Sequence, residues 1–203
     1  MRHASTKQVF AYWDELRGDR AAPERGEIEP GALRHVLTDT FVLENEAIGP
    51  LFRLAGTRLC ALFGSELKGR PFVALWSDIA GQIEMRRLTE AVMNESAGAV
   101  AGVLGKTADG DQVHLELLLL PLRYRGQTHA RLLGALSPNV TPPWLGIGKI
   151  DEIKLLSVRM IFANGKRADR PEPRYPAQAP GTGRPHLVLH HGGLEERRRV
   201  TPL

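Results

Sequence analysis

The sequence predicts an α+β domain built around an antiparallel sheet, and three observations support this prediction. Two short apolar segments, 40–46 and 51–58, are typical of strands and are separated by a glycine-proline break. A longer segment with helical periodicity follows at 78–96. Three further strand-like segments then lie between residues 99 and 138, and Asp109-Gly110 between the first two is a strong hairpin signal.

The first 38 residues are expected to form an N-terminal helical flank. A helix begins at Ser5 or Thr6, the two candidate N-caps, and ends at Gly18, with apolar and aromatic residues at helical spacing between them. Pro23 and Pro30 favour extended or turn backbone in the residues before them, and a short helix is expected to start at Pro30.

The middle of the chain supplies short connecting elements and one unusually apolar strand. The Ala55-Gly56 pair should let another element approach the backbone closely, and LCALFG should form one or two helical turns. Asp78 is the expected N-cap of the longer helix. QVHLELLLLPLRY becomes apolar throughout, as a central or well-covered strand does. The segment 153–161 is a candidate for a final strand.

Composition is that of one ordinary domain with a tail: 203 residues, 42% hydrophobic and 25% charged. No apolar run is long enough to cross a bilayer and the start lacks a secretory signal, so we expect a cytoplasmic protein with no membrane contact. The single cysteine, Cys60, excludes an intramolecular disulfide. Residues 1–163 carry 19 basic and 19 acidic side chains, whereas 164–203 carry 8 and 4. The net charge of +4 therefore lies in a proline- and arginine-rich tail, which we expect to be largely disordered.

A series of short motifs resembles a known family. These are YWDELRG, IEP, FVLE, FRLAGTRL, LFGSELKG, LELLLLPL, LLGALSP and PWLG, in that order. Together they resemble the alphaproteobacterial PAS-like domain family of the PAS-5 type, over roughly Val9 to Phe162. The resemblance implies a five-stranded antiparallel sheet with small helices on one face, enclosing a cavity, and a role in sensing or protein interaction. It implies no catalytic residues and no particular ligand. We expect a flank at 1–38, a PAS-like sensor domain at 39–163 and a tail at 164–203.

Three charged residues on predicted strands are candidate ligand contacts. Arg53 lies between two apolar neighbours and could bind a carboxylate or phosphate in the cavity. The alternative is a structural ion pair with Glu44 or Glu116. Glu116 stands in a nearly all-leucine strand, where a carboxylate must be bonded, so we expect it to pair with an arginine or, failing that, to contact a ligand.

Three further residues complete the candidate pocket. Trp76 could stack on a flat ligand, or simply fill core volume. Arg25 and Glu66 could close a polar network between the flank and the small helices, with solvent exposure as the alternative.

Metal and cofactor signals are weak, and the cofactor stays unknown. His114 and His129 lack a second ligand at diagnostic spacing, so we predict no metal site. Heme would need one axial histidine, which leaves that possibility open. A flavin photosensor would need a reactive cysteine on the helix beside the ring, and Cys60 is better explained by packing.

The residues and the resemblance together indicate a non-enzymatic cytoplasmic sensor or adaptor. It would bind a small molecule, a signalling protein partner or both, and the apolar first helix suggests a homodimer. No nucleophile, base and orienting group can be assembled, so no enzyme is predicted. The alternative is weak nucleic-acid association through the basic tail, which the neutral folded part disfavours.

Overall fold

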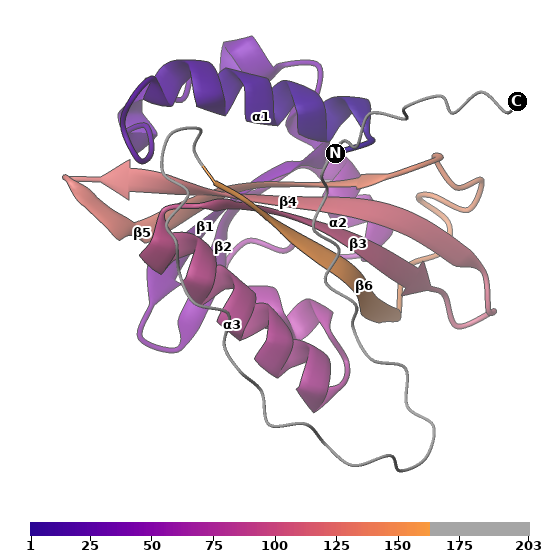
Figure 1. Ribbon diagram of the computed structural model, residues 1–203. Coiled ribbons are helices and arrows are strands. Elements are labelled where there is room, and N and C mark those ends of the chain that lie inside the picture. The colour runs from indigo at the N-terminus through magenta and orange to yellow at the C-terminus, as the bar shows by residue number, and fades with distance from the viewer. Residues whose placement is uncertain (163–203) are drawn as a thin grey trace, which may run out of the picture.

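The computed structural model describes residues 1–162, apart from the side chains of residues 128 and 129. At its centre lies one antiparallel sheet with the strand order β2-β1-β5-β4-β3-β6 (Figure 1). The strands are β1 (Thr40–Glu46), β2 (Gly49–Ala55), β3 (Gly98–Lys106), β4 (Gln112–Tyr124), β5 (Gln127–Pro138) and β6 (Glu152–Ile161). The sheet has six strands rather than the predicted five, because the candidate final strand pairs along the free side of β3. The predicted tail, 164–203, lies outside the described residues.

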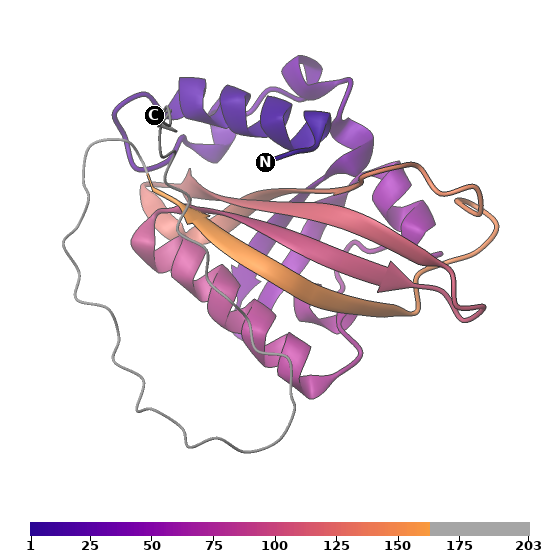
Figure 2. The same ribbon diagram turned by 45° about the vertical axis from the view of Figure 1, so that its right-hand side comes forward.

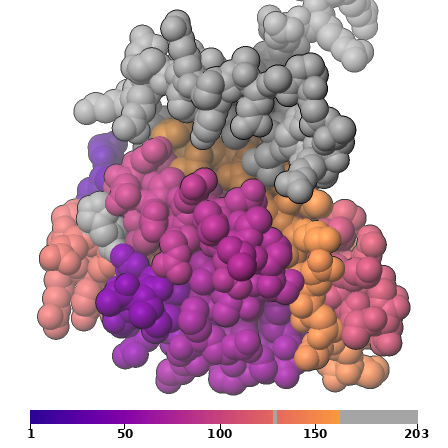
Figure 3. Space-filling view, turned by 90° about the horizontal axis from the view of Figure 1, so that it is seen from below, coloured from indigo at the N-terminus to yellow at the C-terminus, as the bar shows by residue number. Residues whose placement is uncertain are grey.

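Helices cover both faces of the sheet (Figure 2). The helix α1 (Ala4–Arg17) and the 3-10 turns η1 (Arg25–Glu27) and η2 (Pro30–Leu33) lie on what we call the outer face. The inner face packs against α2 (Thr57–Leu62), η4 (Phe72–Leu75) and α3 (Ile79–Glu95). A further turn, η3 (Leu37–Asp39), leads directly into β1. Seen from below, the magenta atoms around α3 dominate the surface, with the orange atoms of β6 beside them (Figure 3).

The strand β4 is apolar from Leu117 to Leu122 because both of its faces are covered there, as predicted. Successive side chains of a strand point to opposite faces, so alternate leucines enter different cores. The inner core contains Leu115, Leu117 and Leu119. The outer core contains Leu118, Leu120 and Leu122.

The N-cap of α1 lies two residues before Ser5 and three before Thr6, the two predicted N-caps. Its N-cap is His3, whose ring Nδ1 accepts a hydrogen bond of 3.2 Å from the Ser5 backbone N–H. Ser5 and Thr6 lie inside the first turn, and their hydroxyls donate to carboxylates of the rest of the domain, Asp39 and Glu116. The prediction failed because these hydroxyls find long-range partners instead of capping their own helix.

The apolar side of α1 faces the sheet rather than solvent. Val9 is fully buried, and Trp13 is buried with its Nε1 donating 2.8 Å to the carbonyl of Pro121. This burial reduces the exposed aromatic surface from which a homodimer through this helix was predicted, although Phe10 and Tyr12 stay partly exposed. Dimerisation itself stays a prediction.

The inner core is filled by aromatic rings where the sequence predicted a cavity. Phe72 lies 5.5 Å from the ring centroids of both Phe41 and Phe52, and 5.3 Å from that of Trp76. All four rings are fully buried. The Phe41 ring lies directly over Gly134, where an added Cβ would come within 2.1 Å of it. A close-packed aromatic cluster therefore occupies the place where the resemblance implied a cavity.

Two local predictions are confirmed and one is partly wrong. A Cβ added to Gly56 would lie 2.3 Å from the carbonyl oxygens of Leu37 and Thr38, which is the close approach expected of the Ala55-Gly56 pair. Asp78 caps α3 by accepting a hydrogen bond of 2.7 Å from the Gly81 N–H. Ile79 is the first apolar residue of the helical periodicity at 78–96, but it is 75% exposed in the first turn of α3.

Candidate functional site

Arg53 forms an ion pair with Glu44 at the edge of the sheet. The register between β1 and β2 shifts at this point, so Arg53 has no residue directly opposite on β1. Its Nε lies 3.5 Å from Oε2 of Glu44, and 62% of its side chain is exposed. Nη2 of Arg131 lies 2.7 Å from the other oxygen of Glu44. The pKa of Glu44 is lowered, chiefly by the hydrogen bond from Arg131. The structural ion pair is thus the arrangement observed.

Glu116 binds the N-terminal end of α1 and, among residues 1–162, pairs with no arginine side chain. It lies on the outer face, where its carboxylate accepts hydrogen bonds from the backbone N–H groups of Arg2 (2.7 Å) and His3 (3.0 Å) and from the Thr6 hydroxyl. Burial alone would raise the pKa of Glu116, but these hydrogen bonds outweigh it and the pKa is lowered. The expected arginine partner was wrong because the backbone N–H groups of Arg2 and His3, just before the first turn of α1, occupy the carboxylate instead.

Trp76 belongs to the aromatic core, and Glu66 belongs to a surface turn. The Trp76 ring is buried against Phe72, and its Nε1 has no hydrogen-bond partner among the described residues. The Glu66 carboxylate accepts hydrogen bonds from the N–H groups of Lys68 and Leu67, and that from Lys68 contributes most to lowering the pKa of Glu66. Within residues 1–162, no contact joins Glu66 to Arg25. The predicted network between the flank and the small helices is therefore wrong.

Of the predicted site residues, Arg25 lines one of the two pockets described here for residues 1–162. This pocket, which we call the outer-face pocket, has a volume of about 180 Å³. It lies between the sheet and residues 25–37, which we call the leading segment. The leading segment contributes Arg25, Ile28, Pro30, Leu33 and Leu37. The strands and the start of α2 contribute Thr40, Phe41, Val42, Leu54, Ala55, Gly56 and Leu133.

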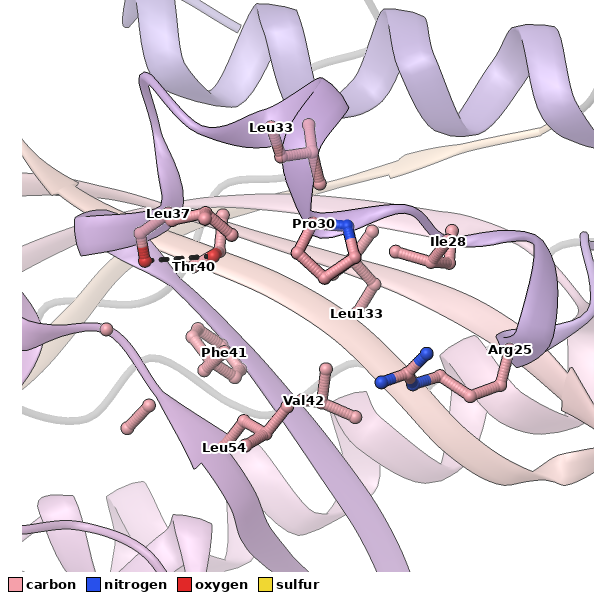
Figure 4. Close-up of a pocket in the computed structure, with 12 residues that line it drawn as sticks. Arg25, Ile28, Pro30, Leu33, Leu37, Thr40, Phe41, Val42, Leu54 and Leu133 are labelled. Atoms are coloured by element: carbon pink, nitrogen blue, oxygen red, sulfur yellow. Dashed lines mark hydrogen bonds between the residues drawn. The ribbon is translucent and has the colours of Figure 1, made fainter.

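The walls of the outer-face pocket are almost entirely apolar. Figure 4 shows the Arg25 side chain reaching from η1 toward Val42 and Leu54, with Ile28 and Leu133 nearby. The Thr40 hydroxyl donates a hydrogen bond of 3.0 Å to the carbonyl of Leu37, so its proton is already engaged. Leu54 is 50% exposed at the rim. The pocket thus combines an apolar wall with one cationic side chain.

A second pocket of about 350 Å³ lies beside the C-terminal end of α2. Its charged and hydroxyl groups bond to one another. Arg70 Nη1 donates 2.7 Å to Ser65 Oγ, and Lys149 Nζ lies 3.3 Å from Asp151 Oδ1. Because these polar groups already have partners within the protein, we consider the outer-face pocket the stronger candidate for ligand binding.

A buried carboxylate that the sequence analysis missed joins the outer and inner layers. Asp39 is fully buried and accepts hydrogen bonds from Ser5 (2.9 Å) on α1 and Ser137 (3.1 Å) on β5. Arg58 on α2 approaches both of its oxygens, at 2.9 and 3.0 Å. An acidic residue directly before an apolar strand is the signal that could have drawn attention to Asp39. Its position beside the leading segment makes it part of the path between α1 and the sheet.

A family model described as a PAS domain matches residues 1–137. The chain belongs to the PAS domain family. The match contains α1 and the leading segment as well as β1 to β5, whereas β6 lies beyond it. Membership of this family gives the protein a sensory, signalling role at the level of the domain. No helix of residues 1–162 is long and apolar enough to cross a membrane.

Solved structures of light-oxygen-voltage domains are similar to this PAS domain. The dark structure of the photoreceptor Aureochrome1 is 14% identical, covers 55% of this chain and 82% of its own, and has a TM-score of 0.42. A Rhodobacter sphaeroides protein is 13% identical, with coverages of 54% and 66% and a TM-score of 0.42. An RNA-binding receptor is 20% identical, with coverages of 57% and 36% and a TM-score of 0.44. Among curated proteins, none matches this chain.

Proposed function

We propose that this PAS domain is a non-enzymatic sensor or adaptor that binds a small molecule in the outer-face pocket and signals through a protein partner. One observation supports this proposal above the others. The outer-face pocket lies where the leading segment meets β1, β2 and β5, so a ligand there would contact both the flank and the sheet. A pocket between two elements of a fold is a common place for ligand binding.

The filled inner core argues for a ligand on the outer face. A flat ligand between the sheet and the inner helices would have to displace Phe52, Phe72 or Trp76, which pack closely against one another. Neither of the two pockets described above is lined by these three rings. Cys60 does not suggest a flavin site either, since its Sγ lies 3.8 Å from the exposed Glu66 carboxylate. The residues of the inner core, as packed, do not fit a flavin or a heme.

The path for a signal runs from the pocket through the leading segment. This segment connects the pocket to α1, whose first turn is held by Asp39 and Glu116. If the leading segment has two conformations and a ligand binds one of them more tightly, that ligand increases the population of the conformation it prefers. The helix α1 would then shift on the sheet, and this shift would change the surface that a partner protein binds.

The test is a thermal-shift screen of small metabolites on the wild-type domain and two variants. Leu54→Trp places a large ring at the rim of the pocket, on a half-exposed edge strand that tolerates it. Ile48→Trp is the matched control, because Ile48 is 65% exposed in the β1–β2 hairpin and does not line the pocket. We expect a ligand whose shift in Tm is lost in Leu54→Trp and kept in Ile48→Trp. A ligand that stabilises both variants equally would contradict the proposed site, and a screen without any ligand would contradict small-molecule sensing.

A further inference from the structure

We infer that the outer-face pocket takes a small apolar carboxylate, with the acid group at Arg25 and the hydrocarbon part against the sheet. This inference rests on the proposed function and adds the chemical class of the ligand. It is drawn from the charge, the lining and the volume of the pocket.

The charge of Arg25 is available to a ligand. Its guanidinium makes no ion pair or hydrogen bond with another side chain of residues 1–162, although carboxylates flank it on the same turn. Glu24 is engaged by Arg123 at 3.4 Å, and Glu27 by Arg20 at 3.0 Å. A guanidinium binds a carboxylate through two parallel hydrogen bonds, which suits a monoanion at the rim.

Glu44, an acidic side chain on β1, is likewise occupied. Glu44 follows Val42 on the same face of β1, and both of its oxygens are approached by arginines, Arg131 and Arg53. Its charge is therefore satisfied without Arg25. Arg25 is thus the one charged side chain among the residues that line the pocket, which favours an anion over a neutral or cationic ligand.

The lining favours a hydrocarbon body over a polyhydroxyl one. Ile28, Leu33, Val42 and Leu133 offer no hydrogen bonds, and the Thr40 proton is donated to the Leu37 carbonyl. A sugar or nucleoside would bury several hydroxyls without partners, at a cost for each one. A ring or short branched chain loses nothing in the same place.

The volume limits the size of the ligand. An apolar cavity of roughly 150 Å³ in another protein accepts benzene. The outer-face pocket, at about 180 Å³, therefore has room for one six-membered ring or a branched chain of similar size. The carboxylate then lies at the rim beside Arg25 rather than inside the apolar part.

Calorimetric titration with three probes of equal shape tests the class of ligand: benzoate, benzamide and benzylamine. The proteins are the wild type, Arg25→Gln and Arg34→Gln. Arg34 is the matched control, since it is an exposed arginine of the same leading segment that does not line the pocket. We expect wild type and Arg34→Gln to bind benzoate with the same Kd, and Arg25→Gln to bind it about tenfold more weakly. Benzamide should bind weakly to all three proteins, and benzylamine should bind to none.

Several outcomes would overturn the inference. Equal binding of benzoate and benzamide, unchanged by Arg25→Gln, would show that the pocket does not select a carboxylate. If Leu54→Trp still abolished that binding, the proposed function would stand while this inference failed. The wild type could also fail to bind benzoate while the metabolite screen finds a neutral ligand for the pocket. In that case too, the proposed function would stand and the inference of a carboxylate ligand would fail. Arg25→Lys, which keeps the charge but loses the two-pronged geometry, should restore part of the benzoate affinity.

Discussion

The carboxylate of Glu116, in the middle of β4, accepts a hydrogen bond from the hydroxyl of Thr6 in the first turn of α1. The two residues are 110 positions apart in the chain. The same carboxylate accepts hydrogen bonds from the backbone N–H groups of His3, the N-cap of α1, and of Arg2 before it. The negative charge also lies at the positive end of the helix dipole. Glu116 is therefore a structural anchor of the flank.

Replacing this anchor should weaken the fold measurably. We expect Glu116→Gln to lower the free energy of unfolding by about 1–2 kcal/mol, because the charge at the helix start and one strong acceptor are lost. Urea denaturation followed by circular dichroism measures the change. Glu90→Gln, at an exposed position of α3, is the control and should change the free energy by less than about 0.5 kcal/mol. An effect of Glu116→Gln no larger than this control would refute the anchoring role.

The same contact should make stability depend on acid. The pKa of Glu116 in the folded domain lies below its ordinary value of 4.5, so the unfolded chain binds the proton more readily. Its contribution to stability is thus fully present above pH of about 5 and is lost as the pH falls through the folded pKa. Urea denaturation measures the free energy of unfolding of the wild type and of Glu116→Gln between pH 7 and 3. The difference between the two free energies should become smaller as the pH falls. A difference that widens in acid would contradict the direction of this pKa shift.

The aromatic cluster of the inner core should behave as a packed interior. We expect Phe72→Ala to lower the free energy of unfolding by about 3–5 kcal/mol, because it removes a ring that contacts three others and leaves a cavity. The truncated domain, if folded, should gain affinity for benzene, detectable as a rise in Tm. Ile147→Ala, at a side chain that is 92% exposed, should be nearly neutral. A small loss for Phe72→Ala would mean that the core is loosely packed.

Gly134 is required because the Phe41 ring occupies the space of a side chain. An added Cβ would lie 2.1 Å from that ring, so Gly134→Ala must push Phe41 out of the cluster. We expect a loss of about 1–3 kcal/mol, typical of overpacking. Gly26→Ala is the matched control, since no heavy atom lies within 4 Å of its added Cβ. Equal Tm values for the two variants would show that the ring moves aside freely.

Arg53, the leading candidate contact from the sequence, should matter little for stability. Its side chain is largely exposed and shares Glu44 with the better placed Arg131. We expect Arg53→Ala to cost less than about 1 kcal/mol, since exposed ion pairs contribute little. Arg131→Ala should cost more, because its guanidinium also lies 3.9 Å from the centroid of the Tyr124 ring. Chemical denaturation of both variants compares them directly, and the reverse order would contradict this assignment.

The order of the elements could be predicted from the sequence, because periodicity and turn signals are local. The helix with Val9 and Trp13, the strands at residues 40–55 and the hairpin at Asp109-Gly110 all follow from neighbouring residues. The continuous leucine run even predicted a strand covered on both faces. The candidate site was harder to predict. Of its six residues, only Arg25 lines either of the two pockets described for residues 1–162, and wall residues such as Leu133 look like any other core residue in the sequence.

Local pattern thus determined which segments are helices and strands, and the family motifs determined the PAS fold. Tertiary packing alone decided that the aromatic rings fill the interior, that Glu116 binds the first turn of α1, and that the open pocket lies on the outer face. The physical reason is that a side chain's propensity depends on its neighbours in the chain. Its partner across the domain depends on strand register and on which space other side chains have already filled.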